Sequence, residues 1–531
     1  MIGVSRKGVK RADGPALHPP TIGWKLSPST GRIAKSLLDR SDHVIVVTPH
    51  RIPATVWTDV PGLKPLQPAL KRLGQEGIGR PVRGSLAGTA GTGVTFGALP
   101  AHDDDDAPTT SFALLKFAGD LVADALADEP RSLVILVHGF SATEEPRVAR
   151  ALLLALGARS WQLPSFRKDP KATALRTVQL AGLRERLDTR RTLAEIEGAN
   201  LVRWLTALPS NKLSATKYRA LLAKLARQHG WEFEWLGESE LRRRNAGAFL
   251  AVAQGNAQPD AGIACLRYRP RGTAAGRAKR NAAPDLALVG KGVIFDTGGT
   301  NLKTAPHMLD MHTDMSGSAV ALGVLQSLTA LGSKLSVDCW LAITENRTGP
   351  TAYKQRDVVT ASNGTTIEVI HTDAEGRMVL ADTLAIASAA RPRVIVDYAT
   401  LTGACVYALY ERYSGVFTNR PAFNELLVRA GRDSGERVWP FPDDPDYDED
   451  IKSKVADVAQ CASGGEADHI LAARFLRRFV PKETPWIHVD LASSLRKDGL
   501  AQMPGGPTGF GVRLTLSLLL DHAGEFNRLA N

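Results

Sequence analysis

Two carboxylates and a guanidinium lie within the seven-residue run His371-Thr372-Asp373-Ala374-Glu375-Gly376-Arg377. A strand-like segment, residues 365–370, precedes this run, and a helix-like segment, residues 378–385, follows it. Polar side chains in a strand-to-helix turn are held by a rigid scaffold and remain accessible to a ligand. Because Asp373 and Glu375 are two residues apart, both could face one metal ion or a metal pair, with Arg377 holding an anion beside them.

Three further polar clusters lie near predicted strand ends in the second half of the chain. They are residues 291–299 with Lys303 shortly after, residues 311–315, and residues 400–404. Strand ends of an α/β sheet are where ligands bind. Three aspartates and one glutamate from these clusters could together hold two hard or borderline cations: Asp296, Asp314, Asp373 and Glu375. A close metal pair can share one hydroxide, activate it at neutral pH and polarise a substrate oxygen.

The elements that must position these clusters alternate between strand and helix from residue 285 onward. Strand patterns cover residues 286–289, 335–343, 365–370, 393–397 and 486–491, and helix patterns cover residues 316–331, 378–385 and 512–522. Buried strands separated by helices favour one sheet sandwiched between two helix layers. We therefore predict an α/β fold with a mixed central sheet for a C-terminal domain over residues 211–531.

The amino-terminal part of the chain predicts a second, smaller α/β domain over residues 1–175. Strand patterns cover residues 42–47 and 132–137, helix patterns cover residues 111–127 and 147–156, and residues 1–40 read as loosely ordered. Residues 77–106 are Gly-rich and end in four aspartates, Asp103 to Asp106, which indicates an exposed loop. Helices are expected over residues 195–208 and 218–229, the second capped by Ser214, with residues 176–210 forming a linker helix region.

Composition describes an ordinary globular chain that is too long, at 531 residues, for one typical core. No run approaches the roughly 18 apolar residues of a membrane helix, and the first twenty residues lack the apolar stretch of a secretory signal. The few cysteines are far apart and predict reduced, buried side chains and a cytoplasmic location: Cys265, Cys339, Cys405 and Cys461.

The net charge of +11 is concentrated at the amino end, where residues 1–100 hold 14 Lys and Arg against 5 Asp and Glu. Such an excess permits contact with nucleic acid or an anionic surface, but a solvated basic face is the more ordinary interpretation. We see no aromatic interleaving and no helix-turn-helix pattern in the sequence that would strengthen the nucleic-acid interpretation.

Several motifs, in matching order, resemble the leucyl aminopeptidase family of two-metal cytosol exopeptidases. The family signature Asn-Thr-Asp-Ala-Glu-Gly-Arg-Leu stands here as His371-Thr372-Asp373-Ala374-Glu375-Gly376-Arg377-Met378. The other motifs are Val289-Gly290-Lys291-Gly292, Phe295-Asp296-Thr297-Gly298-Gly299, Glu345-Asn346 and Ala399-Thr400-Leu401-Thr402-Gly403-Ala404. The resemblance runs from about residue 199 to the C-terminus, whereas the first domain resembles the family only in being a smaller α/β unit.

The resemblance implies roles for eleven residues. The implied metal ligands are Lys291, Asp296, Asp314, Asp373 and Glu375, of which Asp296 and Glu375 touch both ions. Lys303 would polarise the scissile carbonyl, and Arg377 would hold a bicarbonate that acts as general base. Met311 and Thr400 would line the pocket for the first side chain, while Leu401 and Gly403 would contact the peptide backbone.

These implied roles make different demands on the two lysines. A metal ligand must donate a lone pair, so Lys291 would have to bind as a neutral amine, whereas Lys303 must stay charged to stabilise an oxyanion. His371 replaces the Asn that is usual in the family. It could tune metal affinity, or it could be a hydrogen-bonded structural substitute, and both interpretations stay open.

The resemblance implies a cytoplasmic metalloaminopeptidase that acts on short peptides and assembles as a homohexamer. Oxygen ligands plus one amine favour Mn or Zn and are compatible with Mg or Co. Two alternatives are a DNA-binding role through the basic amino-terminal domain and a catalytically silent hexameric scaffold. A phosphate-binding loop at Lys291 is excluded, because Asp285 and Gly292 stand where that loop needs Gly and Ser or Thr.

Overall fold

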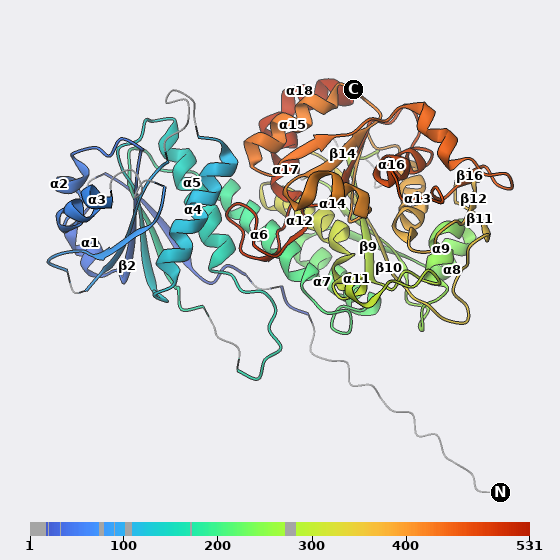
Figure 1. The fold of residues 1–531 in the computed structure, drawn as a ribbon, viewed down its shortest axis with the longest axis horizontal. Coiled ribbons are helices and arrows are strands. Elements are labelled where there is room, and N and C mark those ends of the chain that lie inside the picture. Colours follow the sequence, from blue (N-terminus) through green and yellow to red (C-terminus); the bar gives the residue numbers. More distant parts are fainter. Residues whose placement is uncertain are drawn as a thin grey trace, which may run out of the picture.

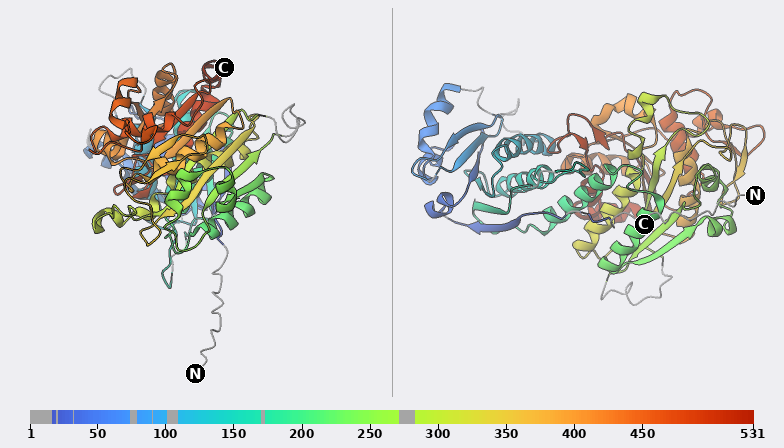
Figure 2. Two further views of the ribbon diagram at one scale, coloured as in Figure 1. Left: turned by 90° about the vertical axis from the view of Figure 1, so that its right-hand side faces the viewer. Right: turned by 90° about the horizontal axis from the view of Figure 1, so that it is seen from below.

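The computed structural model describes residues 17–19, 21–31, 33–73, 79–89, 91–100, 109–169, 173–270 and 283–531. Residues 1–16 of the range predicted to be loosely ordered, and the four aspartates of residues 103–106, lie outside the described residues. The described chain forms two lobes set side by side along the long axis of the molecule (Figures 1 and 2), each built on its own sheet. Within the described ranges, every helix is too short or too polar to span a bilayer.

The first lobe contains a six-stranded sheet in the order β1-β6-β5-β2-β4-β3. Its strands are β1 (Lys25–Thr30), β2 (His43–Thr48), β3 (Val82–Ser85), β4 (Gly93–Ala98), β5 (Ser132–Val137) and β6 (Thr177–Leu183). All neighbours are parallel except β3 and β4. Helices α4 (Ser111–Leu126) and α5 (Glu144–Arg159) pack on one face, while α1 (Lys35–Asp39), α2 (Val56–Asp59) and α3 (Gln67–Leu73) pack on the other.

The two lobes meet through α5 and α6 (Arg190–Thr206). Arg203, which is 1% exposed, donates hydrogen bonds to the carbonyls of Ala158 on α5 and Pro507 in the second lobe. The sheet of the first lobe continues through β6 beyond the expected domain boundary at residue 175. We therefore propose to place that boundary after Leu183, with α6 as a packed junction helix.

The second lobe contains an eight-stranded mixed sheet in the order β15-β14-β17-β13-β9-β10-β8-β7. Its strands are β7 (Glu232–Gly237), β8 (Gly262–Tyr268), β9 (Leu286–Asp296), β10 (Val337–Asn346), β13 (Val394–Ala399), β14 (Ser414–Thr418), β15 (Val438–Pro440) and β17 (Trp486–Asp490). The central strands β17, β13, β9 and β10 are parallel. β7 and β8 pair antiparallel to their neighbours, and β14 is antiparallel to β17 but parallel to β15. The predicted mixed α/β fold is confirmed.

Two helix layers cover this sheet, as predicted (Figure 1). Leu286 and Leu288 of β9 pack into one core with α6, α7 (Ala215–His229), α12 (Ser316–Ala330), α15 (Phe423–Ser434) and α17 (Val512–Leu516). Ala287 and Val289 point to the opposite core, formed with α8 (Glu238–Arg243), α9 (Gly247–Ala253), α13 (Glu375–Ser388) and α16 (Asp468–Arg477). Burial on both faces explains why the central strands read as continuous apolar runs.

Several predicted segments differ from the structure. Residues 1–40 were predicted to be loosely ordered and residues 77–106 to be an exposed loop, but β1 and α1 lie in the first range, and β3 and the buried β4 lie in the second. Strand pairing with segments distant in the chain, β1 with β6 and β4 with β2, orders them.

The strand predicted over residues 365–370 is the three-residue β12 (Thr366–Glu368), which pairs with β11 (Val358–Thr360) and β16 (Val458–Ala459) in a separate sheet. In β12 the apolar Ile367 stands between the polar Thr366 and Glu368, an alternation typical of a peripheral strand. The prediction that the strand before Asp373 belongs to the main sheet was therefore wrong. The predicted closing helix is interrupted by a π-helical turn at Ser517–Asp521, after which α18 (Ala523–Ala530) ends the chain.

Candidate active site

A cavity of about 970 Å³ opens at the carboxyl ends of β9, β13 and β17. Side chains from four segments that are far apart in sequence meet there, as expected at this edge of a parallel sheet. All eleven residues singled out from the sequence line it: Lys291, Asp296, Lys303, Met311, Asp314, Asp373, Glu375, Arg377, Thr400, Leu401 and Gly403.

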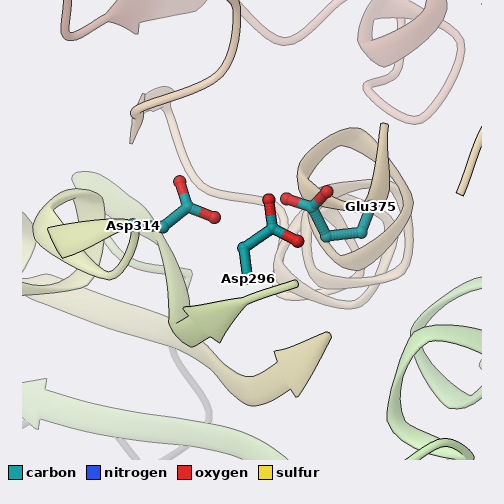
Figure 3. Close-up of side chains that lie close together, drawn as sticks. All are labelled: Asp296, Asp314 and Glu375. Atoms are coloured by element: carbon teal, nitrogen blue, oxygen red, sulfur yellow. The ribbon is translucent and has the colours of Figure 1, made fainter. Parts of the chain in front are cut away.

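Three buried carboxylates form the centre of the site. Asp296 is the last residue of β9, Asp314 caps the 3-10 turn Met311–Thr313 before α12, and Glu375 is the first residue of α13. One oxygen from each lies within 4.8 Å of the others, and Figure 3 shows the three side chains converging. Carboxylates at this separation repel one another unless cations lie between or beside them.

Two lysines supply positive charge on either side of the carboxylates. Lys291 Nζ lies 2.7 Å from Asp314 Oδ1 and 2.9 Å from Glu375 Oε1, and it donates to the carbonyl of Thr400 at 2.9 Å. Lys303 Nζ lies 2.9 Å from Asp296 Oδ2 and also pairs with Asp373. Asp373 thus joins the three central carboxylates through Lys303.

The environment shifts the pKa values of these groups strongly. Burial opposes the charged form of Lys291, but Asp314, Glu375 and Asp296 outweigh it and raise its pKa. Lys303 responds in the same way: burial lowers its pKa, and Asp296, Glu375 and Asp373 raise it further than burial lowers it. Burial, together with Asp296 and Glu375, raises the pKa of Asp373 to about 7. Burial, with Glu375 and Asp296, likewise raises the pKa of Asp314 well above its ordinary value. Without added positive charge, the four acidic groups therefore cannot all be ionised beside two ammonium groups.

The donor set fits divalent cations. Oδ2 of Asp314 is buried and has no hydrogen-bond partner among the described residues, so a good acceptor remains free inside the carboxylate cluster. An unpaired buried carboxylate oxygen is costly unless a cation binds it. The raised pKa of Lys291 belongs to the ion-free site, and a divalent cation between the same carboxylates would reverse it and favour the neutral amine.

Asn346 supports the site, although sequence reasoning assigned it no role beyond membership of a shared motif. It is the last residue of β10 and is fully buried. Its Nδ2 donates to Asp296 Oδ1 at 2.8 Å and to the carbonyl of Thr372 at 3.0 Å. Asn346 therefore ties the end of β9 to the loop that carries Asp373. The indication in the sequence was an amide residue shortly after the strand predicted over residues 335–343.

Arg377 lies in the first turn of α13 and is 1% exposed. Its Nη2 donates to both carboxylate oxygens of Asp468, at 2.8 and 2.7 Å, and its Nη1 donates to the carbonyl of Gln460 at 3.3 Å. The Gln460 side chain also accepts from the backbone N–H groups of Ile370 and His371, which holds the loop in place. No sequence pattern singled out Asp468, because the segment before α16 had no predicted element.

The loop after β13 is pinned by a second residue that sequence reasoning missed. Asp490, the last residue of β17, accepts from the backbone N–H of Leu401 at 3.1 Å and from Thr402 Oγ1 at 2.7 Å. Thr400 Oγ1 donates to Asp314 Oδ1 at 2.8 Å. In the sequence, the feature that could have identified Asp490 is an acidic residue near the end of the strand predicted over residues 486–491. These bonds set the backbone of residues 400–403 against the cavity.

His371 borders the cavity next to the presumed ligands. Its Nδ1 accepts from the backbone N–H of Asp373 at 3.3 Å. Burial and the nearby charge of Lys303 lower the pKa of His371, so the imidazole is neutral at pH 7. This contact shows a structural use of the substitution, and the predicted effect on metal affinity stays a prediction.

Residues 200–516 match the model of the cytosol aminopeptidase family, catalytic domain. The chain belongs to the cytosol aminopeptidase family. It is 41% identical over 326 residues to a probable cytosol aminopeptidase of Syntrophotalea carbinolica, a match that covers 61% of this chain and 63% of that protein. It is 39% identical over 383 residues to one of Polaromonas naphthalenivorans, with 71% of this chain and 72% of the relative covered.

Solved structures extend the likeness of this cytosol aminopeptidase family member to both lobes. The bottromycin maturation enzyme BotP in complex with Mn superposes with a TM-score of 0.76 at 28% identity, covering 91% of this chain and 99% of that chain. A leucyl aminopeptidase from Leishmania major in complex with actinonin gives a TM-score of 0.77 at 24% identity, covering 93% and 94%, and shows the shared fold. The predicted family and the two-lobed α/β architecture are thus confirmed.

Proposed function

We propose that this protein is a metalloaminopeptidase that hydrolyses the N-terminal residue from short peptides. The observation that carries the proposal is the buried cluster of Asp296, Asp314 and Glu375, flanked by two lysines, in a cavity of a cytosol aminopeptidase family member. Family membership supports the reaction class, and the cluster supplies the charge and the ligand atoms that the reaction requires.

Five residues would hold two divalent ions: Lys291, Asp296, Asp314, Asp373 and Glu375. Bound there, the ions would supply an activated hydroxide and polarise the scissile carbonyl. We propose Mn or Zn as the native metal, since oxygen ligands and one amine suit both. The BotP structure was solved with Mn, which supports testing Mn first.

The chain's own residues would orient the peptide and stabilise developing charge. Lys303 is held by two carboxylates, and as an ammonium it can donate to an oxyanion at the carbonyl. Met311 and Thr400 border the space for the first side chain, and Leu401 and Gly403 present backbone groups to the peptide. Asp490 fixes that backbone before substrate arrives, which lowers the entropy cost of binding.

The implied bicarbonate does not fit the described residues. Nη2 of Arg377 already contacts both oxygens of Asp468, Nη1 is bonded to Gln460, and only the single donor Nε is without a partner among the described residues. The positive charge that would attract the anion is therefore neutralised by a side chain of the protein. We derive no step through bicarbonate.

We further propose the cytoplasmic location and the homohexamer that the family resemblance implies. Sedimentation or light scattering of the full chain measures the mass directly, and a monomer would contradict the hexamer. The alternative roles, DNA binding and a silent scaffold, gain no specific support from the described residues, so we do not pursue either as a second function.

Hydrolysis of leucine p-nitroanilide tests the function. Protein stripped with a chelator and reloaded with Mn or Zn is compared with an Asp373→Asn variant and with an Asp188→Asn control, whose carboxylate is exposed and does not line the cavity. We expect metal-dependent release of nitroaniline by the wild type and the control, and a loss of at least about 10²-fold in the Asp373 variant. Silence of the reloaded wild type with several N-terminal residues would refute the proposal.

A further inference from the structure

We propose that Asp468 is the resident oxyanion of the Arg377 site, so that this enzyme works without a small oxyanion from solution. The proposal deepens the aminopeptidase function above and rests on it. It starts from one contact: both carboxylate oxygens of Asp468 lie within hydrogen-bond distance of Nη2 of Arg377.

The Arg377–Asp468 pair is placed as part of the site. Arg377 stands two residues after Glu375 in the first turn of α13, and its side chain is only 2% exposed. Asp468 is the first residue of α16 and its side chain is 26% exposed. Both residues line the cavity that holds the carboxylate cluster. The carboxylate of Asp468 therefore lies at the cavity wall and is more exposed than the guanidinium that it contacts.

Charge decides whether a second anion can bind beside this pair. A buried guanidinium needs a counter-charge, and charge-assisted bonds to a carboxylate satisfy that need. Within the described chain, the negative group in direct contact with Arg377 is Asp468, and Nη1 is already bonded to Gln460. Nε of Arg377 is buried without a partner among the described residues, so an incoming anion would find one free donor on a guanidinium whose charge is already neutralised. Bicarbonate entering next to Asp468 would meet a neutral pair and a like charge at short range, so its affinity would be low.

The segment that carries Asp468 is fixed to the same loop as the presumed ligands. Gln460 accepts from the backbone of Ile370 and His371 through Oε1 and donates to the carbonyl of Ala374 through Nε2. The chain between Gln460 and Asp468 thus begins at the loop that presents Asp373. Removing the carboxylate of Asp468 would therefore leave a cavity beside the buried guanidinium of Arg377.

The test exchanges the built-in carboxylate for one from solution. Asp468→Ala removes it and leaves space, Asp468→Asn fills the space with a neutral amide, and Asp188→Ala removes a carboxylate bound to Arg190 outside the cavity. Each protein is assayed with leucine p-nitroanilide in carbonate-free buffer, and again with sodium bicarbonate or formate at matched ionic strength. Thermal unfolding is recorded with the same two anions, and ¹³C NMR of labelled bicarbonate reports binding without turnover.

We expect the wild type and Asp188→Ala to be insensitive to either anion in rate and in melting temperature. Asp468→Ala should lose about tenfold or more in kcat/KM, recover much of it with bicarbonate or formate, and melt higher in their presence. Asp468→Asn should lose activity without recovery, because the amide blocks the space. A structural role alone would not give anion-specific recovery.

Two results would overturn the proposal. One is a wild type that bicarbonate activates as strongly as it activates Asp468→Ala. The other is an Asp468→Ala protein that binds no labelled bicarbonate and gains no thermal stability from either anion. A failure of the aminopeptidase function itself would give a different result, because the wild type would then be inactive. Binding of labelled bicarbonate to Asp468→Ala would still show whether Asp468 occupies the anion site at Arg377.

Discussion

Nδ2 of Asn346 lies 2.8 Å from Oδ1 of Asp296, and this bond joins the ends of two adjacent parallel strands at the centre of the site. The same amide nitrogen donates to the carbonyl of Thr372 at 3.0 Å. Asp296 also accepts from the backbone N–H of Gly298 at 2.8 Å. One carboxylate oxygen of Asp296 is thereby fixed by the protein, and the other is directed toward Lys303 and the cavity.

Asn346→Ala should weaken metal binding by about 10- to 100-fold, because partners that orient a ligand contribute that much to affinity. Titration of metal-stripped protein with Mn by calorimetry measures the change. Asn363→Ala is the matched control, since Asn363 is exposed, donates to the carbonyl of Arg478 and does not line the cavity. Unchanged Mn affinity in Asn346→Ala would mean either that Asp296 is not a metal ligand or that Asn346 does not orient it.

Gly376→Ala should weaken metal binding without lowering the stability of the fold. A Cβ at this position would lie 2.7 Å from both Cε and Nζ of Lys291, the flexible end of that side chain. Lys291 would have to leave its place between Asp314 and Glu375, whereas α13 would tolerate the alanine, which favours helix by about 1 kcal/mol over glycine.

We expect the melting temperature of Gly376→Ala to stay near that of the wild type, while Mn affinity falls about tenfold or more. Gly524→Ala in α18 is the control, because its Cβ would meet no atom within 4 Å. Wild-type Mn affinity in Gly376→Ala would argue that Lys291 is not a ligand. Global unfolding of Gly376→Ala would show that the Lys291 side chain cannot move away from the added methyl group.

Gly198→Ala should destabilise the junction of the lobes. A Cβ on α6 at this position would lie 2.2 Å from Ser327 Oγ and 2.9 Å from the carbonyl of Gly323, both on α12. Backbone atoms cannot move aside as a side chain can, so the overpacking cost of roughly 1–3 kcal/mol exceeds the gain in helix propensity. Urea unfolding of this variant and of Gly524→Ala measures the difference, and equal stability of both would contradict close helix packing.

The sequence predicted the central elements well because their patterns have one physical cause. Leu286 to Val289 lie between two helix layers, so burial on both faces leaves an apolar run that few other structures produce. Ser214 caps α7 as predicted, by accepting from the backbone N–H of Lys217, because that local preference does not depend on the rest of the fold. All eleven predicted site residues reach one cavity, since their motifs mark the loops at one edge of the sheet.

What the sequence did not show depends on contacts across long separations. Asp468 lies 91 residues from Arg377 and meets it only because α16 and α13 pack in the same layer. Asn346 reaches Asp296 across 50 residues because β10 and β9 are parallel neighbours. The short β12 read as a central strand because Ile367 and Val369 are apolar, although they contact the core from a peripheral sheet.

A buried pair under the site predicts how stability changes with pH. Nδ1 of His488 lies 2.6 Å from Oδ1 of Asp397, and neither side chain is exposed. Trp486 Nε1 donates to the other oxygen of Asp397 at 2.6 Å. Burial lowers the pKa of His488, but Asp397 outweighs it and raises the pKa above the ordinary 6.5. The folded protein therefore binds this proton more tightly than the unfolded chain does.

A histidine with a raised pKa stabilises the fold fully below its unfolded pKa, and the stabilisation is lost as pH rises through the folded pKa. The free energy of unfolding should thus fall above pH 6.5, by at most about 1.4 kcal/mol per pH unit for one proton. Urea unfolding between pH 6 and 9 measures the slope. Asp397→Asn should abolish the fall above pH 6.5, because without that carboxylate burial no longer leaves the pKa of His488 raised, whereas His522→Gln near the surface should keep the wild-type slope. A pH-independent wild type, or one whose stability rises over this range, would show that His488 is neutral in the folded protein.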